Sequence, residues 1–447
     1  MDDYRLIADA LAADIAAGRL RPGDRLPPQR AFARRRGIAA STAARVYREL
    51  ARRGLVTGEV GRGTYVRAGA PPAGAALVEP TGRARVDLEL NYPALDGLAG
   101  PLAEQLAALL RPDVLAGALR PAGPAGTSEA RAAVAGLQAR GAFAPDPARV
   151  LFAGNGRQMI AGAIAALVPA GGRLGVEALT YPMVKAIAAR LGVAAVPLAG
   201  DEAGLLPGAL AAAHRAAPLS AVYLQPTLHN PLSVTMPEGR RAELAAVLRE
   251  LALPAVEDRV WAFLHQGAEP PLAALAPELT ILVDSLSKRF GPGLTAGFAV
   301  VPPAMAAPVA AAVRAGGWTA PGFALAAATR WITAGLAAAA EEARRTDAAA
   351  RQRVAADRLA GFTTRAHPGG YYTWWELPGR WRAETFVAAA AQHGVAVTPA
   401  AAFAAGTAAA PPAVRLALAS PPPAELAAAL DLLAALARAA PEDVADG

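Results

Sequence analysis

The chain has 447 residues and a formal charge of +7, and 54% of its residues are hydrophobic. This length exceeds that of one ordinary domain, so we expect two or three hydrophobic cores. No uninterrupted apolar run reaches the roughly 18 to 20 residues of a membrane span, and the absence of cysteine with only five scattered histidines excludes disulfides and thiolate sites and argues against a metal site.

The positive charge is concentrated in the first 66 residues. They contain 13 arginines and 7 acidic residues, a net charge of +6 that leaves +1 for the other 381 residues. A small basic unit on a nearly neutral body is typical of a nucleic-acid-binding head. The chain opens with acids and helical spacing instead of a basic and then an apolar segment, so we expect a cytoplasmic protein.

Three helices and a hairpin are predicted within this head. From apolar spacing and glycine stops, the helices are expected from Leu6 to Gly18, from Gln29 to Gly37, and from a Ser41 or Thr42 cap to Gly54. Strand-like segments at 55–57 and 64–66 flank a glycine-containing loop. They predict a two-stranded wing beside the third helix.

Residues 68–86 are rich in alanine, proline and glycine and predict a linker. Beyond it, short apolar runs alternate with alanine-rich helical stretches, which predicts an α/β domain around a mainly parallel sheet. The runs are residues 150–153, 173–176, 221–224, 255–257, 281–284 and 297–301. A helical region from 303 to 359 and strands at 371–377 and 414–418 complete the chain.

These elements predict a division of the chain into three parts. A DNA-binding head is expected over residues 1–67, the linker over 68–86, and the body over 87–447. Within the body we expect a large subdomain over about 115–305 and a small α+β subdomain over about 306–440.

Arginine has replaced lysine almost throughout the chain. Only Lys185 and Lys288 remain, against 42 arginines. Lysine condenses with an aldehyde and arginine does not, so a retained lysine is a candidate for covalent chemistry. Lys288 follows a predicted strand, at the sheet edge where open α/β sheets bind ligands. Lys185 falls on a predicted helix, and we interpret it as a surface residue.

Other residues near predicted strand ends suit pyridoxal phosphate, which needs a lysine, a carboxylate at its ring nitrogen, a donor to its phenolate and a phosphate site. Asp258 ends the run 255–257, Asn230 is a candidate donor, and Tyr181 is a candidate to stack on the ring. A strand-to-helix turn offers backbone N–H groups to the phosphate, at Asn155, Gly156 and Arg157. Each residue alone also fits an ordinary cap or turn.

Residues 15–66 resemble the GntR-type winged helix-turn-helix over nearly their whole length. The resemblance implies that Arg30 holds a phosphate and that Arg62 and Gly63 form the wing tip. It places Ser41, Thr42 and Arg45 at the start of the helix that enters the major groove. Many members carry arginine just before the Ser-Thr pair, whereas this chain has Ala40, which does not reach a guanine edge.

The order of the body motifs resembles the fold-type I aminotransferases, and with the head the chain resembles the MocR/GabR regulator family over about residues 4–420. The motifs are Asn-Gly-Arg-Gln at 155–158, Thr-Tyr-Pro at 180–182, Pro-Thr-Leu-His-Asn-Pro at 226–231, Glu-Asp at 257–258 and Ser-Leu-Ser-Lys at 285–288. The resemblance implies a mostly α winged helix-turn-helix joined to an α/β fold-type I domain that binds pyridoxal 5'-phosphate, with a small α+β C-terminal subdomain. It also implies a head-to-tail homodimer.

The resemblance assigns roles at the cofactor and the ligand. Lys288 would be the Schiff-base lysine, with Ser285 and Ser287 beside it at the cofactor. Tyr92 and Arg415 would contact the ligand, Arg415 through the α-carboxylate of an amino acid. The alternative for Arg415 is an ordinary salt bridge at a strand edge.

Three family features are missing at the expected cofactor site. Trp261 stands where a tyrosine donates to the phenolate, and its indole N–H is a larger, differently aimed donor. Thr295 stands where an arginine grips the phosphate, and no tyrosine precedes the segment 126–141, where the partner subunit usually supplies a phosphate contact. We hypothesise that Arg157 replaces the missing arginine; the alternative is an arginine that points outward from the start of its helix.

Three functions follow from these residues. The first is a transcription regulator that binds operator DNA and senses an amine or amino acid through a lysine aldimine. The second is an active aminotransferase with an incidental or regulatory head, which Trp261 and Thr295 disfavour. The third is a regulator whose pocket no longer holds pyridoxal phosphate and senses another ligand.

Overall fold

The computed structural model describes residues 4–16, 19–20, 23–52, 55–59, 63–66, 84–93, 97–406 and 410–441. Most of the expected linker at 68–86 lies outside these residues, as do Gly18, Gly54 and the wing-tip candidate Arg62.

The head contains three helices and a small antiparallel sheet. The elements are α1 (Tyr4–Ala16), α2 (Gln29–Arg36), α3 (Ala40–Arg52), β1 (Arg25–Leu26), β2 (Val56–Glu59) and β3 (Gly63–Val66), with strand order β1-β3-β2. Gly37 ends α2 with a φ of 66°, which suits a residue without a side chain. Helix α3 begins at Ala40, so Ser41 and Thr42 lie in its first turn and the prediction that one of them caps it is wrong.

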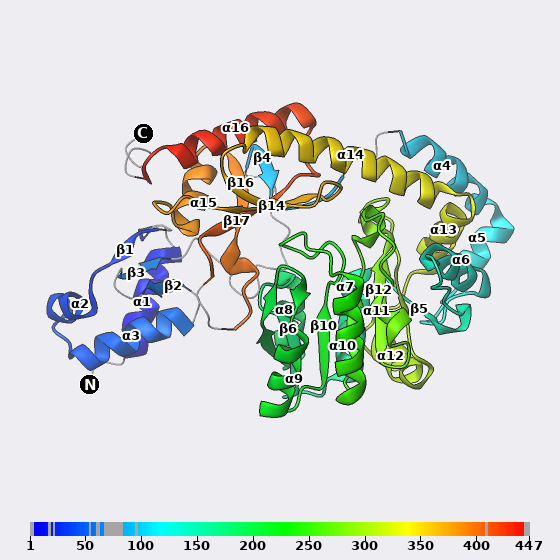
Figure 1. Ribbon diagram of the computed structural model, residues 1–447, viewed down its shortest axis with the longest axis horizontal. Helices are drawn as coiled ribbons and strands as arrows, with labels where there is room; N and C mark the ends of the chain where they lie inside the picture. Colours follow the sequence, from blue (N-terminus) through cyan, green and yellow to red (C-terminus); the bar gives the residue numbers. More distant parts are fainter. Residues whose placement is uncertain are drawn as a thin grey trace.

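A seven-stranded sheet forms the centre of the large subdomain (Figure 1). Its order is β5 (Val150–Ala153), β13 (Gly297–Val300), β12 (Thr280–Ser285), β11 (Ala255–Asp258), β10 (Ala221–Leu224), β6 (Arg173–Glu177) and β7 (Ala194–Leu198). The five strands from β12 to β7 are parallel, and β13 is antiparallel to both neighbours. Because β5, β10, β11, β12 and β13 are buried along their whole length, they were recognisable as continuous apolar runs.

Helices cover this sheet and its periphery. They are α4 (Ala99–Ala107), α5 (Pro112–Ala118), α6 (Ser128–Gln138), α7 (Gly156–Leu167), α8 (Pro182–Arg190), α9 (Pro207–Ala216), α10 (Glu238–Glu250), α11 (Leu272–Leu275), α12 (Pro303–Ala315) and α13 (Gly322–Thr333). A short hairpin joins β8 (Gly200–Asp201) to β9 (Gly204–Leu205). Helix α12 packs against α7 and α13 packs against α6, so both contact the large subdomain, although most of their residues fall in the range of about 306–440 expected for the small one.

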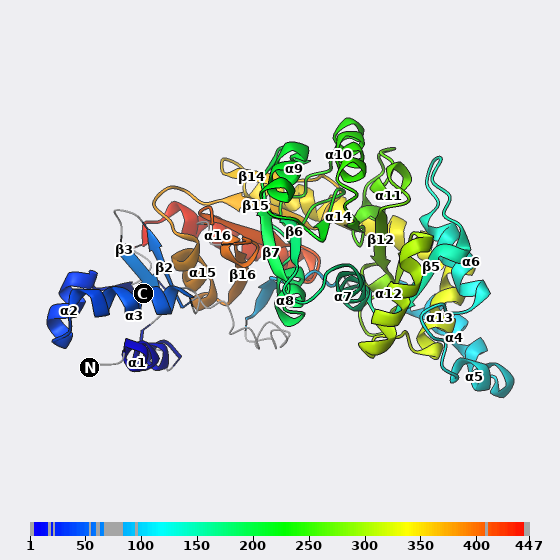
Figure 2. The same cartoon turned by 90° about the horizontal axis from the view of Figure 1, so that it is seen from below.

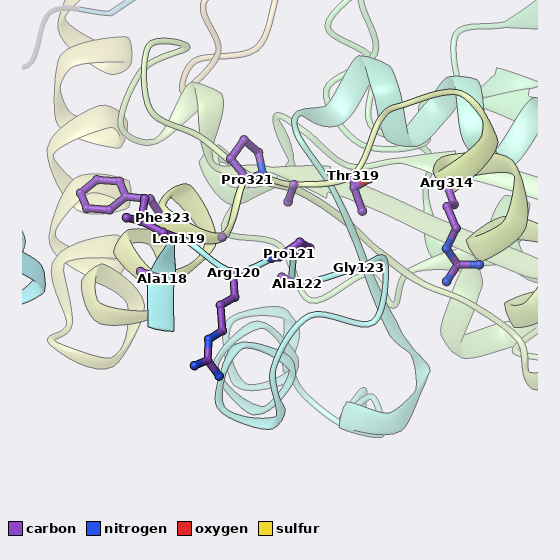
Figure 3. A pocket seen from close by; sticks show the side chains of 12 residues that line it. Ala118, Leu119, Arg120, Pro121, Ala122, Gly123, Arg314, Thr319, Pro321 and Phe323 are labelled. Atoms are coloured by element: carbon purple, nitrogen blue, oxygen red, sulfur yellow. The ribbon is translucent and has the colours of Figure 1, made fainter. Parts of the chain in front are cut away.

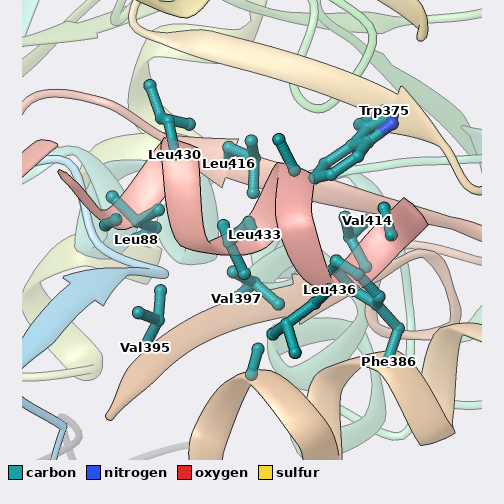
Figure 4. Close-up of a cluster of buried hydrophobic side chains, with 14 of the residues drawn as sticks. Leu88, Trp375, Phe386, Val395, Val397, Val414, Leu416, Leu430, Leu433 and Leu436 are labelled. Carbon is teal, nitrogen blue, oxygen red and sulfur yellow. The ribbon is translucent and has the colours of Figure 1, made fainter. Parts of the chain in front are cut away.

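The small subdomain is built on a five-stranded sheet. Its order is β14 (Thr363–Ala366), β15 (Tyr372–Glu376), β17 (Ala413–Ala417), β16 (Val395–Pro399) and β4 (Val86–Leu88). The helices α15 (Ala383–Gln392) and α16 (Pro423–Arg438) pack on it around Trp375 and Phe386 (Figure 4). Strand β4 precedes the large subdomain in the chain but pairs in parallel with β16, so the small subdomain is assembled from distant segments.

The 23-residue helix α14 (Leu336–Arg358) runs from the large subdomain across to the small one, along the top of the molecule in Figure 1. The head lies at one end of the molecule, beside α15 (Figures 1 and 2). The guanidinium carbon of Arg382, next to α15, lies 3.5 Å from the ring centroid of Tyr65 in β3.

No single helix in the described part of the chain has the length and apolar character of a membrane span. Helices α13 and α14, bent by 76° at their junction, meet that criterion only when they are taken together.

Candidate functional site

Lys288 lies directly after β12, in a short 3-10 helix at residues 286–288. Its Nζ donates a hydrogen bond to the carbonyl of Asn91 over 2.8 Å. The same nitrogen lies 4.5 Å from the ring centroid of Tyr92 and 5.1 Å from that of Trp261. The amine is therefore held among aromatic rings by a segment that lies almost 200 residues away in the sequence.

Asp258 ends β11, the strand next to β12, so its side chain and Lys288 emerge at the carboxyl edge of adjacent parallel strands. One carboxylate oxygen accepts hydrogen bonds from the Tyr223 hydroxyl (2.6 Å) and the Gln225 amide (2.9 Å), and the other accepts the N–H of Val260 (3.0 Å). Burial raises the pKa of Asp258, and these hydrogen bonds oppose the rise. Tyr223 lies in the predicted strand 221–224 and Gln225 directly follows it, and no motif marks either as a site residue.

Hydroxyl groups gather at the N-terminus of α7. Asn155 caps this helix, since its side chain accepts the N–H of Gln158 over 3.0 Å. A Cβ atom on Gly156 would lie 3.1 Å from the Cβ of Ser285, so the helix start and this serine are in close contact. The Ser285 hydroxyl lies 3.2 Å from that of Ser287 and 3.4 Å from that of Thr295. A helix N-terminus with three hydroxyls is suited to a phosphate.

Arg157 is exposed in the first turn of α7. Its charge lowers the pKa of Tyr181, although burial raises that pKa to about 12 overall. The charges of Asp258 and Arg415 also act on Tyr181. Tyr181 is therefore within range of charges at the start of α7, at the end of β11 and on β17.

Arg415 lies on β17, which is flanked by β15 and β16 and is not an edge strand. Its guanidinium donates to the Asn230 side chain (3.4 Å), the Thr398 hydroxyl (3.0 Å) and the carbonyl of Glu89. No salt bridge found in the described part of the chain includes Arg415, so the alternative of an ordinary salt bridge is not observed.

The buried Nε of Arg415 has no hydrogen-bond partner among the described residues. Burial lowers the pKa of this arginine. A buried cation with an unsatisfied donor is suited to an anionic ligand. Asn230, which is joined to Pro231 by a cis peptide bond, contacts both Arg415 and Gln225 and so connects the two subdomains at this point.

Trp261 packs against Tyr372 of β15, with ring centroids 5.5 Å apart. Hydrogen bonds from the side chains of Trp261 and Asn91 lower the pKa of Tyr372, against the larger effect of burial. The tryptophan that stands at the expected tyrosine position therefore packs against the small subdomain. Tyr372 also lies under the guanidinium of Arg415, with its ring centroid 5.1 Å from the guanidinium carbon. The sequence predicts only a strand over residues 371–377, and no motif marks Tyr372 as a site residue.

Lys185 lies on α8, in the predicted helical segment, and is partly buried. Its Nζ donates to the carbonyls of Ala402 and Ala404, the latter over 2.7 Å. It therefore fastens α8 to a loop of the small subdomain.

Four of the described candidate DNA-binding residues lie on α2 and α3 of the head. Arg30, Ser41 and Arg45 are exposed and Thr42 is half-buried, whereas Val46, Tyr47 and Leu50 of α3 face the core. Tyr47 fixes α3 further, because its hydroxyl donates to the carbonyl of Pro27. Gly63 begins β3 with a φ of 118°, and a Cβ there would lie 2.8 Å from the Arg25 side chain. The buried residues of α3 therefore hold this helix with its exposed basic and polar side chains turned away from the core.

A separate pocket of about 570 Å³ lies between the segments 118–123 and 314–323 (Figure 3). Arg120, Arg314, Leu119 and Phe323 are among its lining residues. None of the candidate cofactor residues lines it.

Comparisons with known proteins identify both parts of the chain. Residues 91–433 match the family described as aminotransferase class I and II, and residues 3–66 match the bacterial regulatory proteins of the gntR family. The chain is 30% identical to the HTH-type transcriptional regulator YdeF of Bacillus subtilis, over 94% of this chain and 90% of the relative. It is 28% identical to the HTH-type transcriptional regulator TauR of Rhodobacter capsulatus, over 67% of each chain.

Solved aminotransferase structures share the fold of the body. The structure of LysN, an α-aminoadipate aminotransferase of Thermus thermophilus complexed with N-(5'-phosphopyridoxyl)-L-leucine, aligns with a TM-score of 0.71. The alignment covers 81% of this chain and 93% of that one, at 23% identity. This likeness concerns the fold and carries no substrate assignment.

Proposed function

The chain belongs to the MocR/GabR-type family of transcription regulators, which join a gntR-type head to an aminotransferase class I and II domain, and from this premise we propose that it senses an amine or amino acid through pyridoxal phosphate. The aminotransferase class I and II family is dependent on this cofactor. The observation that carries the proposal is the position of Lys288 and Asp258 at the ends of adjacent parallel strands, beside a cluster of hydroxyls.

The residues at this edge of the sheet fit the cofactor. When bound, pyridoxal phosphate supplies an aldehyde that condenses with primary amines and a ring that withdraws electrons when its nitrogen is protonated. Lys288 would supply the amine, and Asp258, held by Tyr223 and Gln225, would keep the ring nitrogen protonated. Asn155, Gly156, Ser285, Ser287 and Thr295 would hold the phosphate.

Two departures from the family affect individual contacts. The loss of an arginine at Thr295 removes a charged contact to the phosphate, which typically costs on the order of 1.5 to 3 kcal/mol. Arg157, in the first turn of α7, is the cation that we propose as its replacement. Because Trp261 packs edge-on against Tyr372, we assign the contact with the phenolate to Asn230 and not to the indole.

Arg415 is proposed to bind the carboxylate of an amino-acid ligand, with Tyr92 and Tyr181 at the sides of the site. The unsatisfied Nε of Arg415 supports this assignment, since a carboxylate accepts two parallel hydrogen bonds from one guanidinium. A ligand that contacts Lys288 and Arg415 together would favour the arrangement of the two subdomains in which both are within reach.

We further propose that the protein acts in the cytoplasm as a homodimer and that Arg30, Ser41, Thr42, Arg45 and the wing residues Arg62 and Gly63 contact operator DNA. The exposed basic face of α2 and α3 supports this DNA contact for the described residues.

A spectroscopic titration tests the cofactor assignment directly. The wild-type protein is expected to develop a visible absorbance band with added pyridoxal phosphate, and Lys288→Ala is expected to abolish it. Because the chain has only two lysines, Lys185→Ala is a matched control and should retain the band. A wild-type protein without the band, or a band that persists in Lys288→Ala, would overturn the proposal.

A further inference from the structure

The residue after Lys288 is a buried arginine that the cofactor site does not use. Arg289 is 2% exposed. Its guanidinium makes two parallel hydrogen bonds of 3.1 Å to Asp284, at the end of β12, and a third of 3.1 Å to the carbonyl of Ser285. Gln138 of α6 donates to the same aspartate over 2.8 Å. Arg289 therefore fixes both ends of the loop that carries Ser285, Ser287 and Lys288.

The Nε of Arg289 donates to a different element. It donates to Glu341 of α14 over 2.7 Å, and both side chains are buried. A second hydrogen bond joins the same two segments, because the Nε of Arg344 in α14 donates to the carbonyl of Arg289 over 3.3 Å. The first half of α14 is thus bonded to the residue next to the candidate Schiff-base lysine.

The later half of α14 is bonded to the strands of the small subdomain. The Tyr371 hydroxyl donates to Asp347 over 2.7 Å, and Gln352 donates to the carbonyl of Tyr372 over 2.9 Å. Arg351 donates to the carbonyl of Leu418, directly after β17, over 2.7 Å. The strand segments that carry Tyr372 and Arg415 are therefore held by the same helix that holds Arg289.

Glu341 also lies 3.5 Å from the guanidinium of Arg140 and 3.7 Å from that of Arg345, but its contact of 2.7 Å with Arg289 is the shortest of the three. Separation of Arg289 from Glu341 would break a buried, charge-assisted hydrogen bond. This contact therefore favours a joint shift of the Lys288 loop and the first half of α14. A helix is stiff along its axis, so a displacement at Glu341 reaches the small subdomain.

We propose that Arg289 is a positioning residue which, through Glu341 and α14, makes the small subdomain respond to occupation of Lys288. This inference rests on the proposed function, because it requires that the cofactor binds at Lys288. Occupation of Lys288 displaces the adjacent Arg289. The contact of Arg289 with Glu341 then displaces α14, and the bonds of α14 to the small subdomain displace β15 and β17.

Glu341→Gln is the variant that tests this link. It removes the charge from the contact with α14 and leaves the pair of Arg289 and Asp284 intact, whereas a substitution of Arg289 itself would remove a buried cation from both Asp284 and Glu341. It also weakens the longer contacts of Glu341 with Arg140 and Arg345. Glu342→Gln is the matched control, since Glu342 is the next residue of the same helix and pairs with Arg345 near the surface.

The measurement is amide hydrogen exchange of the full chain with and without pyridoxal phosphate, after an absorbance titration of each variant. In wild type and Glu342→Gln we expect slower exchange at 285–289 and also at 372–376 and 413–417. Since site couplings are typically about 5- to 150-fold, the effect at the two strands should be at least about fivefold. In Glu341→Gln the protection should remain at 285–289 and be lost at the strands.

Three other outcomes would overturn the inference. The first is that Glu341→Gln behaves as Glu342→Gln does. The second is that Glu341→Gln loses protection equally at 285–289 and at the two strands, as a general loss of stability would produce. The third is a wild-type protein that binds the cofactor but shows slower exchange only at 285–289. Absence of any cofactor band in wild type instead removes the proposed function itself, and the inference with it.

Discussion

At the scale of single residues, the amine of Lys288 and the carboxylate of Asp258 are each positioned by partners on other segments. The carbonyl of Asn91 accepts from Lys288, and the side chains of Tyr223 and Gln225 donate to Asp258. The charge of Asp258 is therefore held in the interior by two neutral donors.

Asp258 gives a prediction about pH and stability. Because burial raises its pKa, the folded state binds this proton more tightly than the unfolded state does. A raised carboxyl pKa contributes stability at low pH that is lost as the pH rises through the folded pKa. The cofactor-free wild type should therefore gain stability relative to Asp258→Asn as the pH falls from neutral toward the ordinary aspartate pKa of about 4.

Urea unfolding of the two apoproteins at several pH values checks this prediction. Asp113→Asn, at an exposed position of α5, serves as the control and should run parallel to wild type. A difference between wild type and Asp258→Asn that does not change with pH would contradict it.

At the scale of elements, the sequence predicts the strands that are buried on both faces, but it does not predict β1 and β7, which are short or partly exposed. Strand β7 has mixed exposure and β1 has two residues, so neither forms an apolar run. The start of α3 was misplaced because Ser41 and Thr42 are frequent caps, and the sequence does not show that Ala40 already belongs to the helix. The assignment of α12 and α13 depends on packing against α7 and α6, which no local pattern reveals.

One close approach between elements gives a second prediction. A Cβ on Gly297 of β13 would lie 2.2 Å from the carbonyl group of Asn155, which is backbone and cannot rotate away. Gly297→Ala should therefore push back the capped start of α7, with a loss of stability of about 1–3 kcal/mol or more and weaker binding of pyridoxal phosphate.

Thermal unfolding and the absorbance titration measure the two effects. Gly293→Ala is the control, because a Cβ there meets no atom within 4 Å. It should stay within about 0.5 kcal/mol of wild type. Equal behaviour of the two variants would show that the α7 start tolerates displacement.

At the scale of the whole molecule, the head has its own apolar core, and among the described residues Tyr65 and Gly23 of the head lie against Arg382 and Thr385 of the small subdomain. Helix α14 joins the two subdomains of the body, and the head lies beside α15 of the small subdomain (Figure 1). A displacement of the small subdomain would therefore also displace the surface that the head contacts.

The basic face of the head gives a prediction about salt dependence. If Arg30 contacts a phosphate, Arg30→Ala should weaken binding to a duplex of arbitrary sequence. It should also reduce the slope of log affinity against log salt by about 0.9. Fluorescence anisotropy across a range of salt concentrations measures both quantities. Arg249→Ala, an exposed arginine of α10, should leave the slope unchanged; an unchanged slope in Arg30→Ala would remove this contact.

The two-part architecture, most buried strands, the helices of the head and the residue types that suit the cofactor are predictable from the sequence. These features depend on apolar periodicity, glycine stops and chemical identity, which are local properties of the chain. Only the folded structure shows that Trp261 packs against Tyr372, that Lys185 is partly buried, and that Arg289 is bonded to α14. These are contacts between segments far apart in the sequence, and their geometry is set by how sheets and helices pack, so no local pattern encodes them.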